Sequence, residues 1–233
     1  MAAYNGSAYI KNQLSSILKQ LSDEDEIIIV DDASTDQTVE IIQQWGDPRI
    51  LLIKNDRNKG VLQTFERSLR HAKGEIIFLS DQDDIWLDNK VQEIISIFQS
   101  DKDATLVLSD AEVINGDNEI IAKSYYELRG TFVKGAIPNI IKNKYLGCCL
   151  AFRREMLDYF LPLPKDIAMH DMWMGILNDI YGKSIYIEKP LMQYRLHNSN
   201  ASRGPTNYAS LQQMIKWRLM LSKNLVKRLW ELH

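Results

Sequence analysis

Residues 76–86 read IIFLSDQDDIW, in which an apolar run leads directly into three carboxylates, Asp81, Asp83 and Asp84. A short apolar run bounded by polar residues predicts a buried strand. Like charges this close together repel and raise one another's pKa, so the cluster costs free energy unless something offsets it. The segment therefore fits either a solvated turn after a strand or a site where carboxylates hold a cation.

Apolar runs alternate with amphipathic stretches on both sides of this segment. Strands are predicted at residues 26–30, 50–53, 75–79 and 105–108, and helices at residues 38–45, 61–69 and 87–98. This alternation predicts an α/β fold with a largely parallel sheet. Beyond about residue 110 it fades, leaving a predicted helix at 169–181, short strands at 184–187 and 191–194, and a basic amphipathic segment at 207–232.

Composition excludes several classes of protein. The 233 residues carry a net charge of −3, which argues against general nucleic-acid binding because no basic excess is present to neutralise phosphates. Cys148 and Cys149 are adjacent, a spacing that rarely forms a disulfide, so we expect reduced thiols and a reducing compartment. We find no apolar run of about 18 residues and no signal-like N-terminus, so neither a transmembrane span nor a secretory signal is predicted.

A second acidic pair, Asp31 and Asp32, also follows a predicted strand. Ligands of open α/β sheets bind beyond the carboxyl ends of the strands, where both acidic clusters fall. An Asp-x-Asp sequence supplies the oxygen ligands that Mg²⁺ and Mn²⁺ prefer, and such ions complete their shell with substrate phosphates and water. Alone, however, Asp31 and Asp32 also fit a helix cap.

Five segments together resemble the inverting family 2 glycosyltransferases: MAAYNG at 1–6, VDDASTDQT at 30–38, LSDQDDIW at 79–86, HDMWM at 170–174 and YRLHNSNAS at 194–202. The resemblance implies a single-domain, Rossmann-like nucleotide-diphospho-sugar transferase fold of the GT-A type, with a mainly parallel central sheet flanked by helices. The glycosyltransferase domain would span residues 1–206, divided into a nucleotide-binding half (1–110) and an acceptor half (111–206). A C-terminal basic amphipathic helix (207–233) would follow.

The resemblance also assigns roles to individual residues. Those that would bind the donor nucleotide and its sugar are Ala3, Tyr4, Asp31, Asp32, Asp81 and Gly147. Asp83 and His197 would ligate a divalent metal, Mg²⁺ or Mn²⁺, on the diphosphate. Asp171 would be the catalytic base.

Each role has a simpler alternative. Asp171 fits the N-cap of the following helix, His197 fits an exposed histidine in a polar loop, and Gly147 fits a close-packing glycine in a strand. Two departures from the family pattern also stand out. The strand before Tyr4 is short, and His170 replaces the glutamate that usually precedes the catalytic aspartate.

The resemblance implies metal-assisted single displacement with inversion, moving a sugar from a UDP- or dTDP-sugar to a hydroxyl of a glycan or lipid-linked acceptor. The alternatives are a nucleotide-binding module without activity and a haloacid-dehalogenase-like phosphatase. The expected location is the cytoplasm, with the protein either free or peripheral at the inner face of the membrane. Residues 207–232 fit a helix packed on its own domain, on a second copy in a homodimer, or on an anionic membrane surface.

Overall fold

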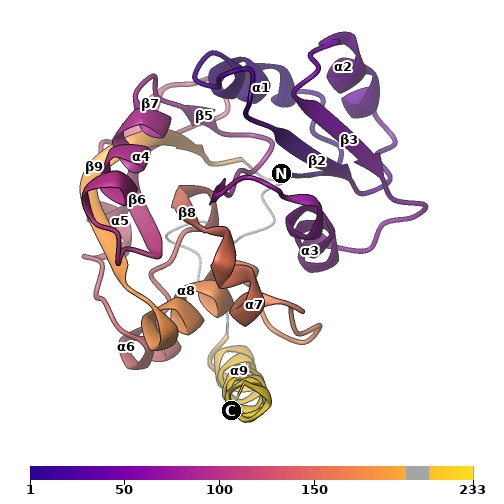
Figure 1. Cartoon of the computed structure of the whole chain (residues 1–233). Coiled ribbons are helices and arrows are strands. Elements are labelled where there is room, and N and C mark those ends of the chain that lie inside the picture. The colour runs from indigo at the N-terminus through magenta and orange to yellow at the C-terminus, as the bar shows by residue number, and fades with distance from the viewer. Residues whose placement is uncertain (198–209, 233) are drawn as a thin grey trace.

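Two β-sheets form the centre of the computed structural model, which describes residues 1–197 and 210–232 (Figure 1). The first sheet is entirely parallel, with β1 (Ala2–Ala3), β2 (Ile27–Asp31) and β3 (Ile50–Lys54) in that order. All five residues of β2 are buried, and four of them are Ile or Val, the β-branched residues that favour strands. Three helices belong to this half: α1 (Ile10–Leu18), α2 (Thr38–Gln44) and α3 (Val61–His71).

The second sheet is mixed. Its strands run in the order β4 (Ile76–Phe78), β8 (Leu150–Arg153), β6 (Leu106–Ile114), β9 (Ser184–Arg195) and β5 (Ile85–Trp86), with β7 (Ile120–Ala122) also paired to β6. Only β6 and β9 pair in parallel, and the other pairings are antiparallel. The predicted α/β class is confirmed, but the mainly parallel arrangement is limited to the first sheet and the β6–β9 pair. The reason is that β7 and β8 return beside β6 in the opposite direction.

Six more helices follow in the described residues: α4 (Lys90–Ser100), α5 (Tyr125–Arg129), α6 (Ala136–Ile141), α7 (Leu157–Phe160), α8 (His170–Tyr181) and α9 (Leu211–Glu231). Two 3₁₀ turns lie at Gly147–Cys149 and Arg154–Met156. The predicted strands at 184–187 and 191–194 are one continuous strand, because β9 pairs with β6 across the intervening residues. Residues 198–202 of the quoted motif, and 207–209 of the predicted terminal helix, lie outside the described residues.

The first strand is short, as expected. β1 pairs only with Val30 and Asp31 of β2, so the residues at the start of β2 have no strand beside them on that side in the described chain. A cavity of about 700 Å³ occupies this position, lined by Ile27 and Ile28 of β2 and by β4. The sheets therefore remain separate here and are joined by a shared apolar core instead.

One face of α9 packs on the domain. Leu221 and Leu225 join the main core, and the buried Arg228 guanidinium donates hydrogen bonds to three carbonyl oxygens: Tyr159, Leu161 and Pro162. α9 lies next to α6, at the lower end of Figure 1. Among the helices of the described chain, none combines the length and apolar character needed to cross a membrane. Cys148 and Cys149 are free and buried, as predicted.

Candidate active site

A cavity of about 330 Å³ collects residues from both halves of the chain. Its walls include most of the residues singled out from the sequence: Ala3, Tyr4, Asp32, Asp81, Asp83, Gly147 and Asp171. Asp31 lies behind this wall, and His197 reaches it through Asp83. The strand ends and the α8 N-terminus therefore meet at one place.

The side chain of Gln82 links two of the quoted motifs. Its Oε1 accepts a hydrogen bond from the Tyr4 backbone N–H at 2.9 Å, and its Nε2 donates to the Tyr4 carbonyl at 3.0 Å. A Cβ on Gly6 would lie 2.2 Å from Gln82 Oε1, so only glycine leaves room for this amide. Gln82 thus holds Ala3 and Tyr4 against the acidic segment.

Asp31 and Asp32 organise neighbouring loops. Asp31 accepts hydrogen bonds from the backbone N–H and hydroxyl of Ser34. Asp32 Oδ1 accepts from Asn55 Nδ2 at 2.7 Å and from the Lys59 N–H at 2.8 Å, and its Oδ2 accepts from the Gly60 N–H at 2.9 Å. Neither aspartate caps α2, whose N-cap is Gln37, so the helix-cap alternative is wrong. Oδ2 accepts only one of these bonds, which leaves Asp32 acceptor capacity at the cavity wall.

Asp83 and His197 lie in direct contact. His197 Nε2 is 2.8 Å from Asp83 Oδ2, and both side chains are largely buried, so the exposed-loop alternative for His197 is wrong. The His197 ring stacks on Tyr9 at 4.9 Å between centroids. Arg195 fixes the same turn, because its Nε donates to the Asp83 carbonyl at 2.7 Å and its backbone N–H donates to Asp84 Oδ1 at 3.0 Å.

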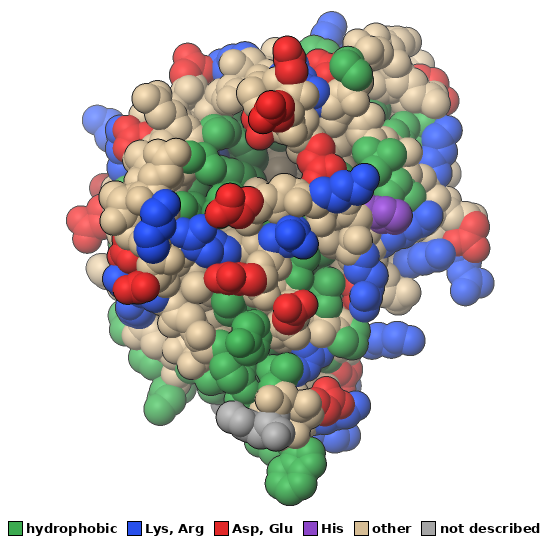
Figure 2. Space-filling view, viewed as in Figure 1, with side chains coloured by type: hydrophobic (Ala, Val, Ile, Leu, Met, Phe, Trp, Pro, Cys, Tyr) green, Lys and Arg blue, Asp and Glu red, His purple; other side chains and the backbone are tan. Residues whose placement is uncertain are grey.

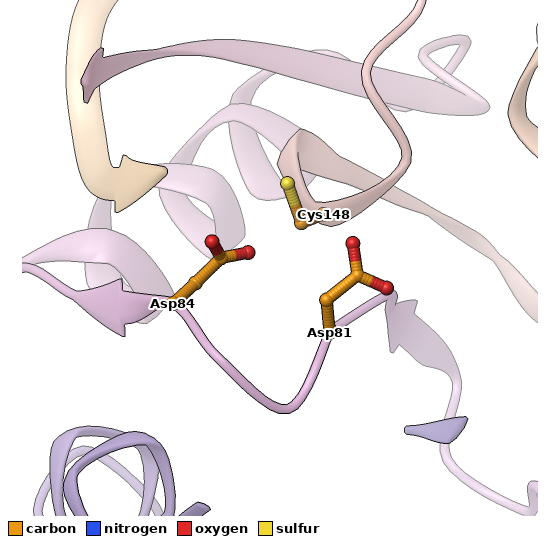
Figure 3. Close-up of side chains that lie close together, drawn as sticks. All are labelled: Asp81, Asp84 and Cys148. Carbon is orange, nitrogen blue, oxygen red and sulfur yellow. The ribbon is translucent and has the colours of Figure 1, made fainter. Parts of the chain in front are cut away.

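The side chains of Asp81, Asp84 and Cys148 converge (Figure 3), with potential ligand atoms within 4.8 Å of one another. Burial, then repulsion from Asp83 and Asp171, raises the pKa of Asp81 to about 7. Burial, then repulsion from Asp83 and Asp81, raises the pKa of Asp84 well above its usual range. Asp84 Oδ2 is buried and has no hydrogen-bond partner among the described residues. The close approach of these carboxylates, already evident in the sequence, therefore still costs free energy in the folded protein.

Carboxylate and imidazole groups at this wall suit Mg²⁺ or Mn²⁺, and the unsatisfied Asp84 oxygen shows that the cluster has spare ligand capacity. Cys148 is a poor ligand for these ions, because they prefer oxygen and because burial raises the pKa of its thiol well above the usual range. Asp83 with His197, supported by Asp81 and Asp84, is the better donor set.

Asp171 is the second residue of α8 and is 7% exposed. The helix begins at His170 with Met169 as N-cap, so the N-cap alternative for Asp171 is wrong. Its Oδ1 accepts a hydrogen bond from the Met172 N–H at 2.6 Å. Burial raises the pKa of Asp171 to about 6, although backbone N–H groups of Met172 and Gly147 offset part of the rise. Such a carboxylate is ionised at neutral pH and more basic than an ordinary aspartate.

Gly147 lies against the start of α8. A Cβ at this position would be 3.0 Å from His170 Nε2 and 3.5 Å from Asp171 Cβ, so the glycine permits close approach of the backbone to both side chains. Gly147 belongs to a buried 3₁₀ turn, and not to a strand as the packing alternative assumed.

Three residues of the site have no role in the sequence-based prediction: Gln82, His170 and Arg195. All three lie inside the quoted motifs, so the available signal was their nearness in sequence to assigned residues. Gln82 lies between Asp81 and Asp83, His170 precedes Asp171, and Arg195 lies two positions before His197. Their partners are distant in sequence, which is why the contacts could not be predicted. Arg195 and Asp84, for example, are 111 positions apart.

Parallel strands that end at an acidic cavity, closed by a carboxylate from the second half, define an α/β protein of the nucleotide-sugar transferase type. The sequence profile of Glycosyl transferase family 2 matches residues 1–161. The chain belongs to this family of glycosyltransferases, so the phosphatase alternative is wrong.

Two curated bacterial proteins show comparable similarity. The UDP-Glc:alpha-D-GlcNAc-diphosphoundecaprenol beta-1,3-glucosyltransferase WfgD of Escherichia coli is 30% identical over 203 residues, covering 87% of this chain and 78% of WfgD. The dTDP-rhamnosyl transferase RfbG of Shigella flexneri is 30% identical over 218 residues, covering 86% of this chain and 72% of RfbG.

Solved structures share the fold. S. aureus TarS 1–349 in complex with UDP-GlcNAc superposes with a TM-score of 0.73 at 18% identity, covering 94% of this chain and 63% of the TarS chain. The mannosyltransferase PcManGT from Pyrobaculum calidifontis, in complex with GDP-Man and Mn²⁺, gives a TM-score of 0.64 at 20% identity, covering 86% of this chain and 56% of PcManGT. This chain therefore spans less than two thirds of both solved chains.

Proposed function

We propose that this protein transfers a sugar from a nucleoside-diphosphate donor to a hydroxyl of a glycan or lipid-linked glycan, with inversion at the anomeric carbon. The observation that carries the proposal is the single cavity in which Asp83 of the first half faces the same space as Asp171 of the second. A UDP- or dTDP-sugar is the proposed donor, in keeping with the printed names of WfgD and RfbG.

Donor binding falls to the first half. Ala3 and Tyr4 would line the nucleotide pocket, and Asp32 would use its remaining acceptor capacity to accept a hydrogen bond from the nucleobase. Asp31 would support the nucleotide pocket indirectly, by holding the turn at Ser34 through its hydrogen bond to the Ser34 N–H. Asp81 would lie near the ribose, and Gly147 would leave room for the sugar beside α8.

Asp83 and His197 would hold a divalent cation on the diphosphate, with Asp81 and Asp84 close enough to share its charge. When bound, Mg²⁺ or Mn²⁺ supplies positive charge that stabilises the leaving diphosphate. Arg195 keeps the backbone of Asp83 and Asp84 in place for this purpose.

Asp171 would act as the general base. Its raised pKa of about 6 leaves it ionised at neutral pH yet able to take the proton of the attacking hydroxyl. The proton moves to an Asp171 carboxylate oxygen as the acceptor oxygen bonds to the anomeric carbon and the bond to the diphosphate breaks. One base and no carboxylate nucleophile give a single displacement, hence inversion.

The proposal is tested by incubating the protein with Mn²⁺, UDP-glucose or dTDP-rhamnose, and a GlcNAc-diphospho-lipid acceptor, then measuring both nucleoside diphosphate and glycosylated lipid. We expect both products from the wild type and neither from Asp83→Asn. Nucleotide binding without either product would instead support the inactive binding module.

We further propose that α9 brings the protein to an anionic membrane surface at the cytoplasmic face. The free thiols of Cys148 and Cys149 are consistent with that reducing compartment. Opposite its packed face, α9 exposes four apolar side chains at helical spacing: Ile215, Leu219, Val226 and Trp230. Exposed lysines border this stripe: Lys216, Lys223 and Lys227. At the lower end of Figure 2, apolar side chains lie beside both basic and acidic ones. An exposed apolar stripe bordered by lysines suits anionic headgroups.

Co-sedimentation with vesicles tests the membrane proposal. Leu219→Ser with Trp230→Ser should reduce pelleting with phosphatidylglycerol vesicles at least tenfold, because both residues are exposed and neither belongs to the packed face. Ile120→Ser with Ile121→Ser on β7 is the matched control, since both isoleucines are 52% exposed on another element. Equal pelleting of wild type and the α9 variant would contradict the proposal.

A further inference from the structure

His170 is a buried polar residue whose two ring nitrogens have no hydrogen-bond partner in the described chain. It begins α8, lines the active-site cavity and is 3% exposed. Neither Nδ1 nor Nε2 has a hydrogen-bond partner among the described residues. Buried polar groups are nearly always paired, because an unpaired one loses its hydrogen bonds to water without replacement. Two such atoms on one side chain at a cavity wall indicate that their partner arrives with a ligand.

The position of the ring identifies the part of the ligand concerned. His170 stacks on Phe65 of α3, with ring centroids 4.0 Å apart, so it spans the junction of the two halves. Its Nε2 lies against Gly147, and its neighbour in sequence is Asp171. A group bound here would sit between the nucleotide-binding half and the proposed base, which is where the transferred sugar must be for reaction.

The chemistry of the ring narrows the partner further. Burial lowers the pKa of His170 to about 4, so the imidazole is neutral at neutral pH. A neutral imidazole offers one donor and one acceptor, which matches a sugar hydroxyl. A diphosphate, in contrast, offers only acceptors and attracts cations.

We propose that His170 hydrogen-bonds a hydroxyl of the transferred sugar and so helps to select and orient the donor. This inference rests on the proposed function, because it deepens the specificity of the same cavity. It makes His170 a specificity-determining residue.

Titration calorimetry tests the proposal by comparing each donor with its own nucleoside diphosphate. The probes are UDP-glucose, UDP-GlcNAc, dTDP-rhamnose and GDP-mannose, with UDP, dTDP and GDP, all in Mn²⁺. For donors that bind more tightly than the diphosphate alone, His170→Phe should lose about tenfold of that sugar-dependent affinity, because it keeps the stack on Phe65 but removes both nitrogens. Affinity for the nucleoside diphosphate should stay within about twofold.

Two further variants separate binding from folding. His170→Gln, which retains a donor and an acceptor, should recover part of the sugar-dependent affinity. His71→Phe makes the same change at an exposed histidine of α3 and should behave as the wild type. An unchanged sugar-dependent affinity in His170→Phe would overturn the inference, and so would a wild type in which no sugar adds affinity. A wild type that binds none of the nucleotides would contradict the proposed function itself.

Discussion

Replacing Asp171 with asparagine should affect activity and stability in opposite directions. Asparagine keeps an oxygen that can accept the Met172 N–H bond, so the start of α8 should persist. It cannot take up a proton, so turnover should fall roughly 10²- to 10⁴-fold, the usual contribution of a general base. Donor affinity should change less than about threefold, since Asp171 acts on the acceptor hydroxyl.

The stability effect follows from the pKa of the buried carboxyl. Burial raises that pKa from 3.8 to about 6 in the folded protein, which corresponds to roughly 3 kcal/mol. The folded state binds the proton more tightly than the unfolded state, so this stabilisation is complete below pH 3.8 and is lost as the pH rises through 6. Asparagine carries no charge at any pH, and the variant should therefore be more stable than wild type at pH 8 by up to about 3 kcal/mol.

Guanidinium unfolding at pH 5 and pH 8, combined with donor titration and a transfer assay, measures all three quantities. The expected pattern is slower transfer, retained donor affinity, and a gain in unfolding free energy that is larger at pH 8. An Asp171→Asn protein that loses donor affinity with unchanged turnover would refute the role as base. A loss of stability at pH 8 would refute the description of Asp171 as a buried, poised carboxyl.

Three other outcomes follow from the same geometry. In Asp83→Asn, the gain in nucleotide affinity that Mn²⁺ provides should fall at least tenfold. Asp88→Asn is the control, because the Asp88 side chain is 84% exposed, and it should keep that gain. An equal loss in titrations of both variants would mean that Mn²⁺ responds only to the overall negative charge. The transfer rate kcat/KM should rise with pH to a plateau above about 6, as Asp171 loses its proton, and a flat profile from pH 5 to 8 would contradict this. Arg228→Ala should lower the unfolding free energy by roughly 3 kcal/mol, because the buried guanidinium loses its three hydrogen bonds to backbone carbonyls. Lys227→Ala, at an exposed position, should change the unfolding free energy by less than about 0.5 kcal/mol. Equal denaturant midpoints for both variants would show that α9 is not held as described.

The sequence predicts the first half of the fold better than the second. The continuous Ile and Val of β2 and the spacing of α3 give local signals that identify strand and helix. The antiparallel return of β8 beside β6, and its pairing with β4, depend on contacts between segments far apart in the chain. Local periodicity carries no information on such pairings, so the mixed character of the second sheet could not be predicted.

For the site, the order of the motifs predicted which residues meet at the cavity, but the sequence did not predict their hydrogen-bond partners. Asp83 and Asp171 lie on one cavity because both occupy strand or helix ends that face the same edge. Asp32 Oδ1, in contrast, already accepts hydrogen bonds from Asn55 and Lys59, and Oδ2 accepts one from Gly60, contacts that only the folded loop reveals. Oδ2 is therefore the Asp32 oxygen with more acceptor capacity left for a ligand.

The stereochemical course of sugar transfer tests the central claim most directly. Proton NMR of the first product formed from UDP-glucose or dTDP-rhamnose, with Mn²⁺ and the GlcNAc-diphospho-lipid acceptor, reports the configuration of the new glycosidic bond. Single displacement assisted by Asp171 predicts a bond of opposite configuration to that of the donor, absent from the Asp171→Asn reaction over the same time. A product that retains the donor configuration would contradict the account, because a single displacement from the face opposite the leaving diphosphate always inverts the anomeric carbon.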